Sequence, residues 1–245
     1  MYRFVTTSVL LLLAATNAIA AGPADPDPGA VTAGSYTIDP SHTRVQFTVS
    51  HMGFTNWYGD FSGTNGTLRL DPRDIAASSV EIMIPVASVS TTNTILDGEL
   101  KSADWFDAVH FPDIRFVSKT VTKTGASTAD ITGDLSFHGV TKPVVLAARF
   151  NGAGINPITK AYTVGFDATT TLQRSDFGVK NYVPLIGAEI TIRISAAFEK
   201  KPEARVGQQC MSCNNSLADI ERSPARAHLQ YLDDLPISQA PLIRR

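Results

Sequence analysis

Residues 130–150 read DITGDLSFHGVTKPVVLAARF, and this stretch decides the fold class. Apolar residues occupy alternate positions on both sides of the dipeptide His138-Gly139. They are Ile131, Leu135 and Phe137 before the dipeptide, and Val144, Leu146, Ala148 and Phe150 after it. Side chains two positions apart lie on the same face of a β-strand. The stretch therefore predicts two strands, each with one buried face, joined by a turn at His138-Gly139.

The same alternation recurs along most of the chain between residues 35 and 200. Longer runs begin at Val45, Val80, Tyr162 and Ile190, and shorter runs cover residues 36–39, 68–70 and 114–116. Together they predict eight to ten short strands, with further turns at Asn65-Gly66 and Asn151-Gly152. The best helical candidate is residues 94–103, so no alternation of strands with helices supports a parallel sheet.

An antiparallel sheet of this size can close into a barrel and so remove its exposed edges. We predict an all-β fold, an eight-stranded antiparallel up-and-down barrel with one short helix. A sandwich of two sheets stays open as an alternative, because it produces the same alternation. The barrel matters for function because eight strands leave an interior that can hold one slender ligand.

The two ends of the chain differ in composition from this central region. Residues 1–20 contain the basic Arg3, an apolar run and the small residues Ala18-Ile19-Ala20, which predicts a secretory signal peptide that is cleaved off. Residues 21–34 are rich in Pro, Gly, Ala and Asp and predict a flexible linker. Residues 201–245 lose the alternation and predict a disordered tail. We expect no membrane span after cleavage, since no later run approaches about 18 apolar residues.

Bulk composition argues against one class of partner. The chain is 43% hydrophobic and 18% charged, with a formal net charge of −2. Its Lys and Arg residues are scattered, so no basic stripe predicts a nucleic-acid partner. Cys210 and Cys213 form a C-x-x-C pair within the predicted tail, without the helix start that a redox pair normally occupies. We interpret this pair as incidental or as a local disulfide.

Residues 100–116, LKSADWFDAVHFPDIRF, hold the densest group of ionisable side chains. Asp104, Asp107, His110 and Asp113 recur at every third position there. On a helix each would be rotated by about 60° from the last, so the four would not converge on a metal ion. We interpret the stretch as a short helix and turn whose aromatic residues pack while the acids stay solvated. No metal site, catalytic residue or cofactor is predicted here or elsewhere in the chain.

Five stretches in order resemble the YceI-like family, whose members are lipocalin-like in fold. They are YTIDPSHTRVQFTVSHMGF (36–54), YGDFSGTNGTLRLD (58–71), LKSADWFDAVHFPDIRF (100–116), DITGDLSFHGVTKPVVL (130–146) and LQRSDFGV (172–179). The resemblance implies an eight-stranded barrel around an apolar tunnel, with the short helix near one mouth. It also implies that residues 100–116 belong to the rim of the barrel, and that the ligand is a long-chain isoprenoid or a quinone-like lipid in the periplasm.

We predict non-enzymatic binding, storage or transport of such a lipid. The residues predicted to line the ligand site are Phe47, Val49, His51, Trp57, Phe61, Ile82, Phe106, Phe116, Phe137, Phe166 and Arg174. For each apolar residue, ordinary core packing is the competing interpretation. His51 and Arg174 are the candidates for a polar head group, although Arg174 paired with Asp176 across a turn is the simpler interpretation of that arginine.

Two other functions stay open at this point. One is an enzyme on the same barrel with His51 or His110 as the acid or base, which would need a buried histidine paired with a carboxylate and facing the cavity. The other is an envelope interaction protein that uses residues 201–245 to bind a partner. The sequence also leaves open whether the chain forms a homodimer.

Overall fold

The computed structural model describes residues 22–201, and the predicted signal peptide and nearly all of the predicted tail, including Cys210 and Cys213, lie outside this part. The strands are β1 (Gly34–Ile38), β2 (Arg44–His51), β3 (Thr55–Phe61), β4 (Asn65–Leu70), β5 (Ser79–Pro85), β6 (Asp113–Lys123), β7 (Thr128–Phe137), β8 (Val140–Ile155), β9 (Tyr162–Gln173) and β10 (Ile186–Lys200). The α-helix is α1 (Thr94–Lys101), and short 3-10 helices cover Pro28–Ala30, Pro40–His42, Ile75–Ala77, Val86–Ser88 and Arg174–Phe177.

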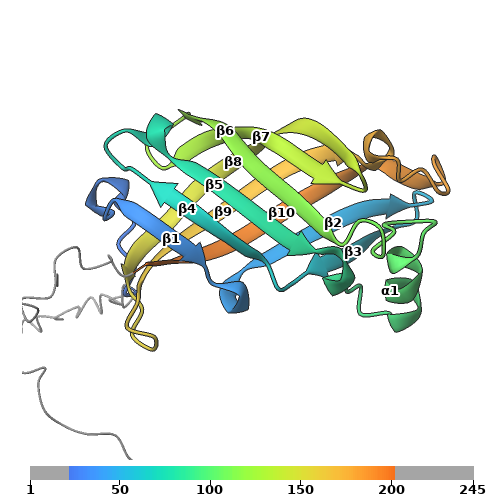
Figure 1. Ribbon diagram of the computed structural model, residues 1–245, viewed down its shortest axis with the longest axis horizontal. Coiled ribbons are helices and arrows are strands. Elements are labelled where there is room, and N and C mark those ends of the chain that lie inside the picture. Colours follow the sequence, from blue (N-terminus) through green and yellow to red (C-terminus); the bar gives the residue numbers. More distant parts are fainter. Residues whose placement is uncertain (1–21, 202–245) are drawn as a thin grey trace, which may run out of the picture. The chain divides into compact units, whose positions relative to one another are not determined.

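All the strands form one antiparallel sheet that closes on itself (Figure 1). From β4 to β10, each strand pairs with the strand that follows it in the sequence. This includes β5 and β6, although short helices lie between them along the chain. Closure comes from β1, which pairs with β4 through Tyr36 and Leu68 and with β10 through Ile38 and Phe198. The predicted barrel is therefore confirmed, and the sandwich is wrong.

The ten segments make eight strands around the barrel because two strands are interrupted. β1 and β2 lie one after the other along β10, where Ile38 pairs with Phe198 and Val45 pairs with Ile194. The Asp39 carboxylate accepts a hydrogen bond of 2.9 Å from the Ser41 N–H and so starts the short helix between them. β3 and β4 are the two halves of the next strand, since β3 pairs with β2 and β4 pairs with β1.

The expected flexible linker is wrong for residues 22–34. Asp25 forms a two-way backbone bridge with Ala153 of β8, with N···O distances of 2.8 and 2.9 Å. Val31 is only 7% exposed and packs in the core. Gly152 allows this docking, because a Cβ atom at that position would lie 3.0 Å from the Ala24 side chain. Composition identified a Pro-rich segment but could not show the surface that receives it.

Two of the three predicted turn dipeptides are wrong. His138-Gly139 does form the turn between β7 and β8, with both residues at positive φ. Asn65-Gly66 instead begins β4, where Gly66 lies against the backbone of β5 at a distance that excludes any Cβ atom. Asn151-Gly152 lies inside β8, where the pairing with β9 shifts register between Phe150 and Gly152. Glycine at both places serves close approach and not chain reversal.

The predicted short helix is confirmed as α1. Asn93 caps it, because its side-chain oxygen accepts hydrogen bonds from the N–H groups of Ile95 and Leu96. The segment between β5 and β6 that contains α1 lies at one end of the barrel (Figure 1). It is joined to the outer edge of β3 by paired backbone hydrogen bonds between Asp60 and Ser90. We call this end of the barrel the α1 end.

Buried side chains form two clusters along the barrel. One lies toward the α1 end and contains Phe47, Phe61, Trp105, Phe106 and Val179. The other contains Tyr36, Leu68, Phe150, Val164 and Phe198 and lies where β1 closes the sheet. The interior is not filled between them, and this space is the candidate site.

Candidate functional site

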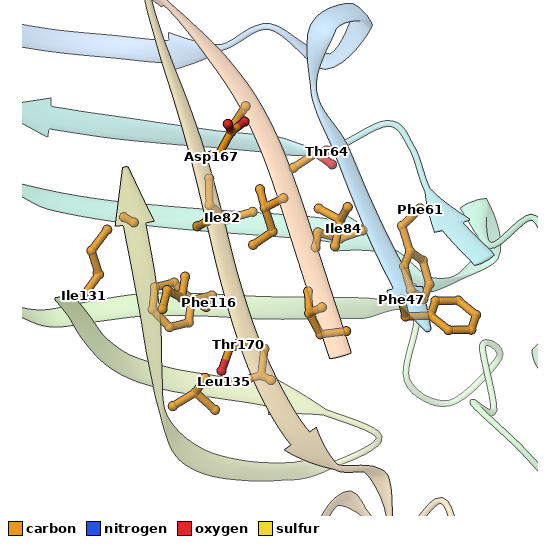
Figure 2. A pocket seen from close by; sticks show the side chains of 18 of the residues that line it. Phe47, Phe61, Thr64, Ile82, Ile84, Phe116, Ile131, Leu135, Asp167 and Thr170 are labelled. Carbon is orange, nitrogen blue, oxygen red and sulfur yellow. The ribbon is translucent and has the colours of Figure 1, made fainter. Parts of the chain in front are cut away.

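A cavity of about 780 Å³ occupies the interior of the barrel. It runs from Pro28 and Val31 at one end to Trp105 and Tyr182 at the α1 end. Its wall consists mainly of the inward-facing Ile, Val, Leu, Phe and Ala side chains of the strands (Figure 2). The volume falls within the roughly 300–1,000 Å³ of known small-molecule sites, which are also mostly apolar.

All the residues predicted to line the ligand site border this cavity. Phe47, Val49 and His51 come from β2, Trp57 and Phe61 from β3, Ile82 from β5, Phe116 from β6, Phe137 from β7, Phe166 from β9, Phe106 from the segment after α1, and Arg174 from the 3-10 helix after β9. The sheet brings them together because each lies on the inward-facing side of its strand or at the α1 end. Their role in ligand binding stays a prediction.

Aromatic side chains cluster in the cavity wall toward the α1 end. The Phe106 ring lies 5.4 Å from Phe137, 6.2 Å from Phe61 and 6.5 Å from Phe47, measured between ring centroids. The Phe47 ring lies over Gly59, the residue that pairs with it across β2 and β3. The missing side chain at Gly59 lets this ring lie against the wall and leaves the centre of the barrel open.

Arg174 is the main polar group at the α1 end, and it is only 5% exposed. Its guanidinium donates four hydrogen bonds of 2.8–3.0 Å to backbone carbonyl oxygens, those of Val179, Asn181, Ile186 and Gly187. Its Cζ atom lies 5.4 Å from the centroid of the Trp105 ring. Burial lowers the pKa of Arg174 below its usual value.

These contacts contradict the expected pairing of Arg174 with Asp176. Asp176 is exposed, and the hydrogen bonds of the guanidinium go to the loop that follows. Four of the five N–H donors of Arg174 are already used, so its first role is to hold residues 179–187 in place. One N–H donor of Arg174, on Nη1, is left without a hydrogen bond to residues 22–201.

Residues 100–116 close the wall at the α1 end, as expected of a barrel rim. Trp105 and Phe106 are buried, and the Trp105 indole N–H donates to a Glu99 carboxylate oxygen at 3.1 Å. The four ionisable residues do not converge, since His110 contacts Asp107 at 2.9 Å in a local turn while Asp113 starts β6. Between residues 22 and 201, no group of His, Cys, Asp and Glu side chains is arranged to hold a metal ion.

The arrangement required for an acid/base enzyme does not occur among the described histidines. His51 borders the cavity, and its ring packs against the ring of Trp57, at 6.0 Å between centroids. His42 and His110 contact carboxylates but are mainly exposed, at 66% and 71% of the side chain. His138 contacts the Phe177 carbonyl oxygen. Within the described chain, no histidine is at once buried, cavity-facing and paired with a carboxylate.

Several cavity residues were not among the predicted site residues. Ile131, Leu135, Ala168, Thr170 and Leu172 all face the interior with the predicted Phe137 and Phe166. Their signal was present in the alternation, since every residue of the right parity on each strand faces the same space. Thr64 is different: it lies in the break between β3 and β4, where alternation carries no information.

The fold and cavity define a lipocalin-like barrel with an open apolar interior. Within that class, the chain belongs to the YceI-like family, since the model of the YceI-like domain matches residues 36–198. A UPF0312 protein of Pseudomonas syringae pv. tomato is 39% identical over 184 residues, which are 74% of this chain and 94% of that protein.

Solved structures agree with this assignment. The YceI protein of Campylobacter jejuni is 27% identical, with a TM-score of 0.56 over 62% of this chain and 90% of that one. A polyisoprenoid binding domain from Saccharophagus degradans is 12% identical, with a TM-score of 0.52 over 69% of this chain and all of that domain. The second similarity shows the shared fold.

No helix among residues 22–201 is long and apolar enough to cross a membrane.

Proposed function

We propose that the protein binds a long-chain isoprenoid or a related lipid such as a quinone, and that it stores or carries this lipid without catalysing a reaction. The observation that carries the proposal is the apolar cavity of about 780 Å³ that runs along the barrel. A folded protein normally fills its interior at the density of an organic crystal. An apolar space of this size therefore suits an apolar molecule better than water.

The energetics of such binding are sufficient without a charged anchor. A ligand of about forty carbons at about 0.3 kcal/mol per atom would gain about 12 kcal/mol, which corresponds to roughly nanomolar affinity. The lining agrees with this requirement, since apolar side chains contribute most of it. The Saccharophagus degradans domain, which shares the fold, is described as a polyisoprenoid binding domain, and this supports the same class of ligand.

The place of action is proposed from the N-terminal sequence. Residues 1–20 have the basic start, apolar run and small residues of a secretory signal, which would export the chain to the periplasm. A carrier in that compartment would shield the hydrocarbon from water during its passage between membranes. Detection of the chain in the periplasmic fraction, with a mature N-terminus at Ala21, would test this part.

The direct test of binding is native mass spectrometry of protein purified from its host without detergent. We expect a mass larger than that of the polypeptide, and organic extraction should release one long-chain lipid per protein molecule. Protein that carries only solvent, and that takes up no isoprenoid when one is supplied, would contradict the proposal.

A further inference from the structure

Exposed apolar side chains are concentrated around the α1 end of the barrel. Three segments lie at this end: the β2–β3 hairpin, the start of α1, and the segment between β9 and β10 (Figure 1). Their exposed apolar residues are Met52 (49% exposed), Phe54 (86%), Ile95 (83%), Tyr182 (60%), Val183 (39%) and Leu185 (60%). We call these six residues the apolar rim. Two of the loops are joined by a hydrogen bond of 2.8 Å from the Met52 N–H to the Leu185 carbonyl oxygen.

The apolar rim is continuous with the wall of the cavity. Met52, Ile95 and Tyr182 border the cavity and are also exposed to solvent, so the interior reaches the surface between them. Tyr182 also packs against Trp105, with 6.1 Å between the ring centroids. A hydrocarbon chain that leaves the barrel at this end would pass from one apolar surface directly to another.

The loops that carry the rim contain no charged side chain. Residues 50–59, 88–96 and 181–188 include no Asp, Glu, Lys or Arg, and the charged residues that flank them along the chain are Asp60, Asp97, Lys180 and Glu189. At the opposite end of the cavity, the exposed residues Arg73 and Lys123 border it, and at the α1 end exposed Glu99, which accepts the Trp105 indole N–H, also borders it. The loops of the apolar rim could therefore enter an apolar medium without removing a charge of their own from water.

The backbone gives a second indication that these side chains have a role. Met52 and Gly53 both have positive φ, of 54° and 73°, and the Phe54 N–H donates to the His51 carbonyl oxygen, as in a type I′ turn. Asn-Gly is the preferred pair in such a turn, and a long side chain at the first position is strained. Tyr182 also has positive φ, of 58°. Large apolar side chains are thus held at positions that local stability alone would give to Asn or Gly.

We propose that the apolar rim is a membrane-docking surface, which inserts into the hydrocarbon edge of a lipid bilayer and places the α1 end of the cavity against it. This inference rests on the proposed function, because it gives a lipid of the bilayer an apolar path into the barrel. Docking by insertion needs no anionic head groups, since the rim loops carry no basic residues. A second copy of the chain seated on the rim would instead close that path.

The test compares variants of the full chain, purified from its host, in sedimentation with phosphatidylcholine vesicles. Phe54→Ser combined with Leu185→Ser should weaken vesicle binding about tenfold or more, because each change removes a large side chain from the apolar contact. Neither residue borders the cavity. Ile158→Ser is the matched control, since Ile158 is 88% exposed and lies in the β8–β9 loop, outside the rim.

A second variant separates docking from folding. Met52→Asn restores the preferred turn pair, so it should keep or raise the melting temperature while it weakens binding to vesicles. A structural role of Met52 predicts a lower melting temperature for this variant. The docking role predicts weaker vesicle binding with an equal or higher melting temperature.

Three results would overturn the proposal: equal binding by the double variant and the Ile158→Ser control, binding that requires anionic lipid, or a wild-type dimer that the double variant dissociates. The last result would assign the rim to a second copy. Lipid extracted from each preparation keeps the two proposals apart. If the wild-type protein carries lipid but does not bind vesicles, only the docking proposal is wrong. If the wild-type protein binds vesicles but never carries lipid, the proposed ligand is wrong.

Discussion

At the scale of single residues, Arg174 shows how a buried charge can organise a loop. Its charge has no carboxylate partner among its hydrogen bonds, and four carbonyl dipoles take that place. The sequence suggested Asp176 as its partner because the two residues are neighbours. Carbonyl oxygens are present at every residue, so no sequence pattern could have identified the actual acceptors.

Replacing Arg174 by Met should destabilise the protein by about 3 kcal/mol or more, because each hydrogen bond from a charged donor contributes about 1.5–3 kcal/mol and the freed carbonyls stay buried. Urea unfolding of the purified variant measures this loss. Arg193→Met is the control, since Arg193 is exposed on β10 and its loss should change stability by less than about 0.5 kcal/mol. Equal effects of the two changes would show that Arg174 does not hold the loop.

Thr64 offers the opposite case, a buried hydroxyl with no hydrogen-bond partner in the described chain. It is 1% exposed and borders the cavity. Thr64→Val should therefore raise the stability by about 1 kcal/mol, since it removes an unpaired polar group and keeps the shape of the side chain. Thermal unfolding would detect this as a rise of about 2–4 °C.

Thr43→Val provides the matched comparison. The Thr43 hydroxyl accepts a hydrogen bond of 3.2 Å from the Ala197 N–H, so the same substitution should destabilise the protein by about 1 kcal/mol. A loss of stability in Thr64→Val would mean that the Thr64 hydroxyl is bonded to a ligand or to water.

At the scale of elements, β1 is short but decides whether the barrel closes. Tyr36 at its centre is fully buried, and its hydroxyl donates to the Thr32 carbonyl oxygen in the segment before β1. Alternation placed a strand at residues 36–39, but its pairing with both β4 and β10 depends on contacts between distant parts of the chain. The same limit explains why the docking of residues 22–34 on β8 was not predicted.

Tyr36 makes this closure sensitive to alkali. Burial, reinforced by Tyr162, raises the pKa of Tyr36 to about 12. The folded state then keeps this proton at a pH where the unfolded chain, with a pKa near 10, has lost it. The corresponding stability is complete below about pH 10 and is lost as the pH rises toward 12, by about 3 kcal/mol in total.

Unfolding free energies measured from about pH 9 to 12 would reveal this loss. Tyr36→Phe is the control, because it should remove this contribution to the pH dependence while costing the hydrogen bond to Thr32 at every pH. Parallel curves for the two proteins would show that Tyr36 does not titrate as described.

At the scale of the whole molecule, the interior is the feature that links fold to function. The alternation of residues predicted which side chains face inward, and the resemblance predicted a tunnel. Neither could give its width, because that depends on rotamers such as the one that lays Phe47 over Gly59. For this reason all the predicted lining residues border the cavity, while Thr64 and the hydrogen bonds of Arg174 were missed; a role in ligand binding stays a prediction.

Filling the cavity should remove the ligand without unfolding the barrel. Ala168 faces the cavity near the middle of β9, next to Ala148 of β8. We expect Ala168→Phe to lower the amount of extractable lipid at least about tenfold, because the ring would occupy the path of the chain, while stability changes by less than about 1.5 kcal/mol. Ala147→Phe is the control, since Ala147 is exposed on the outer face of β8 and the same ring there leaves the interior unchanged.

The most direct measurement is a crystal structure of the protein purified from its host without detergent or added lipid. We predict continuous electron density for a chain with regularly spaced methyl branches, along the barrel from the α1 end toward Val31. A barrel whose side chains have collapsed to fill the interior, or one that holds only ordered water there, would contradict the account.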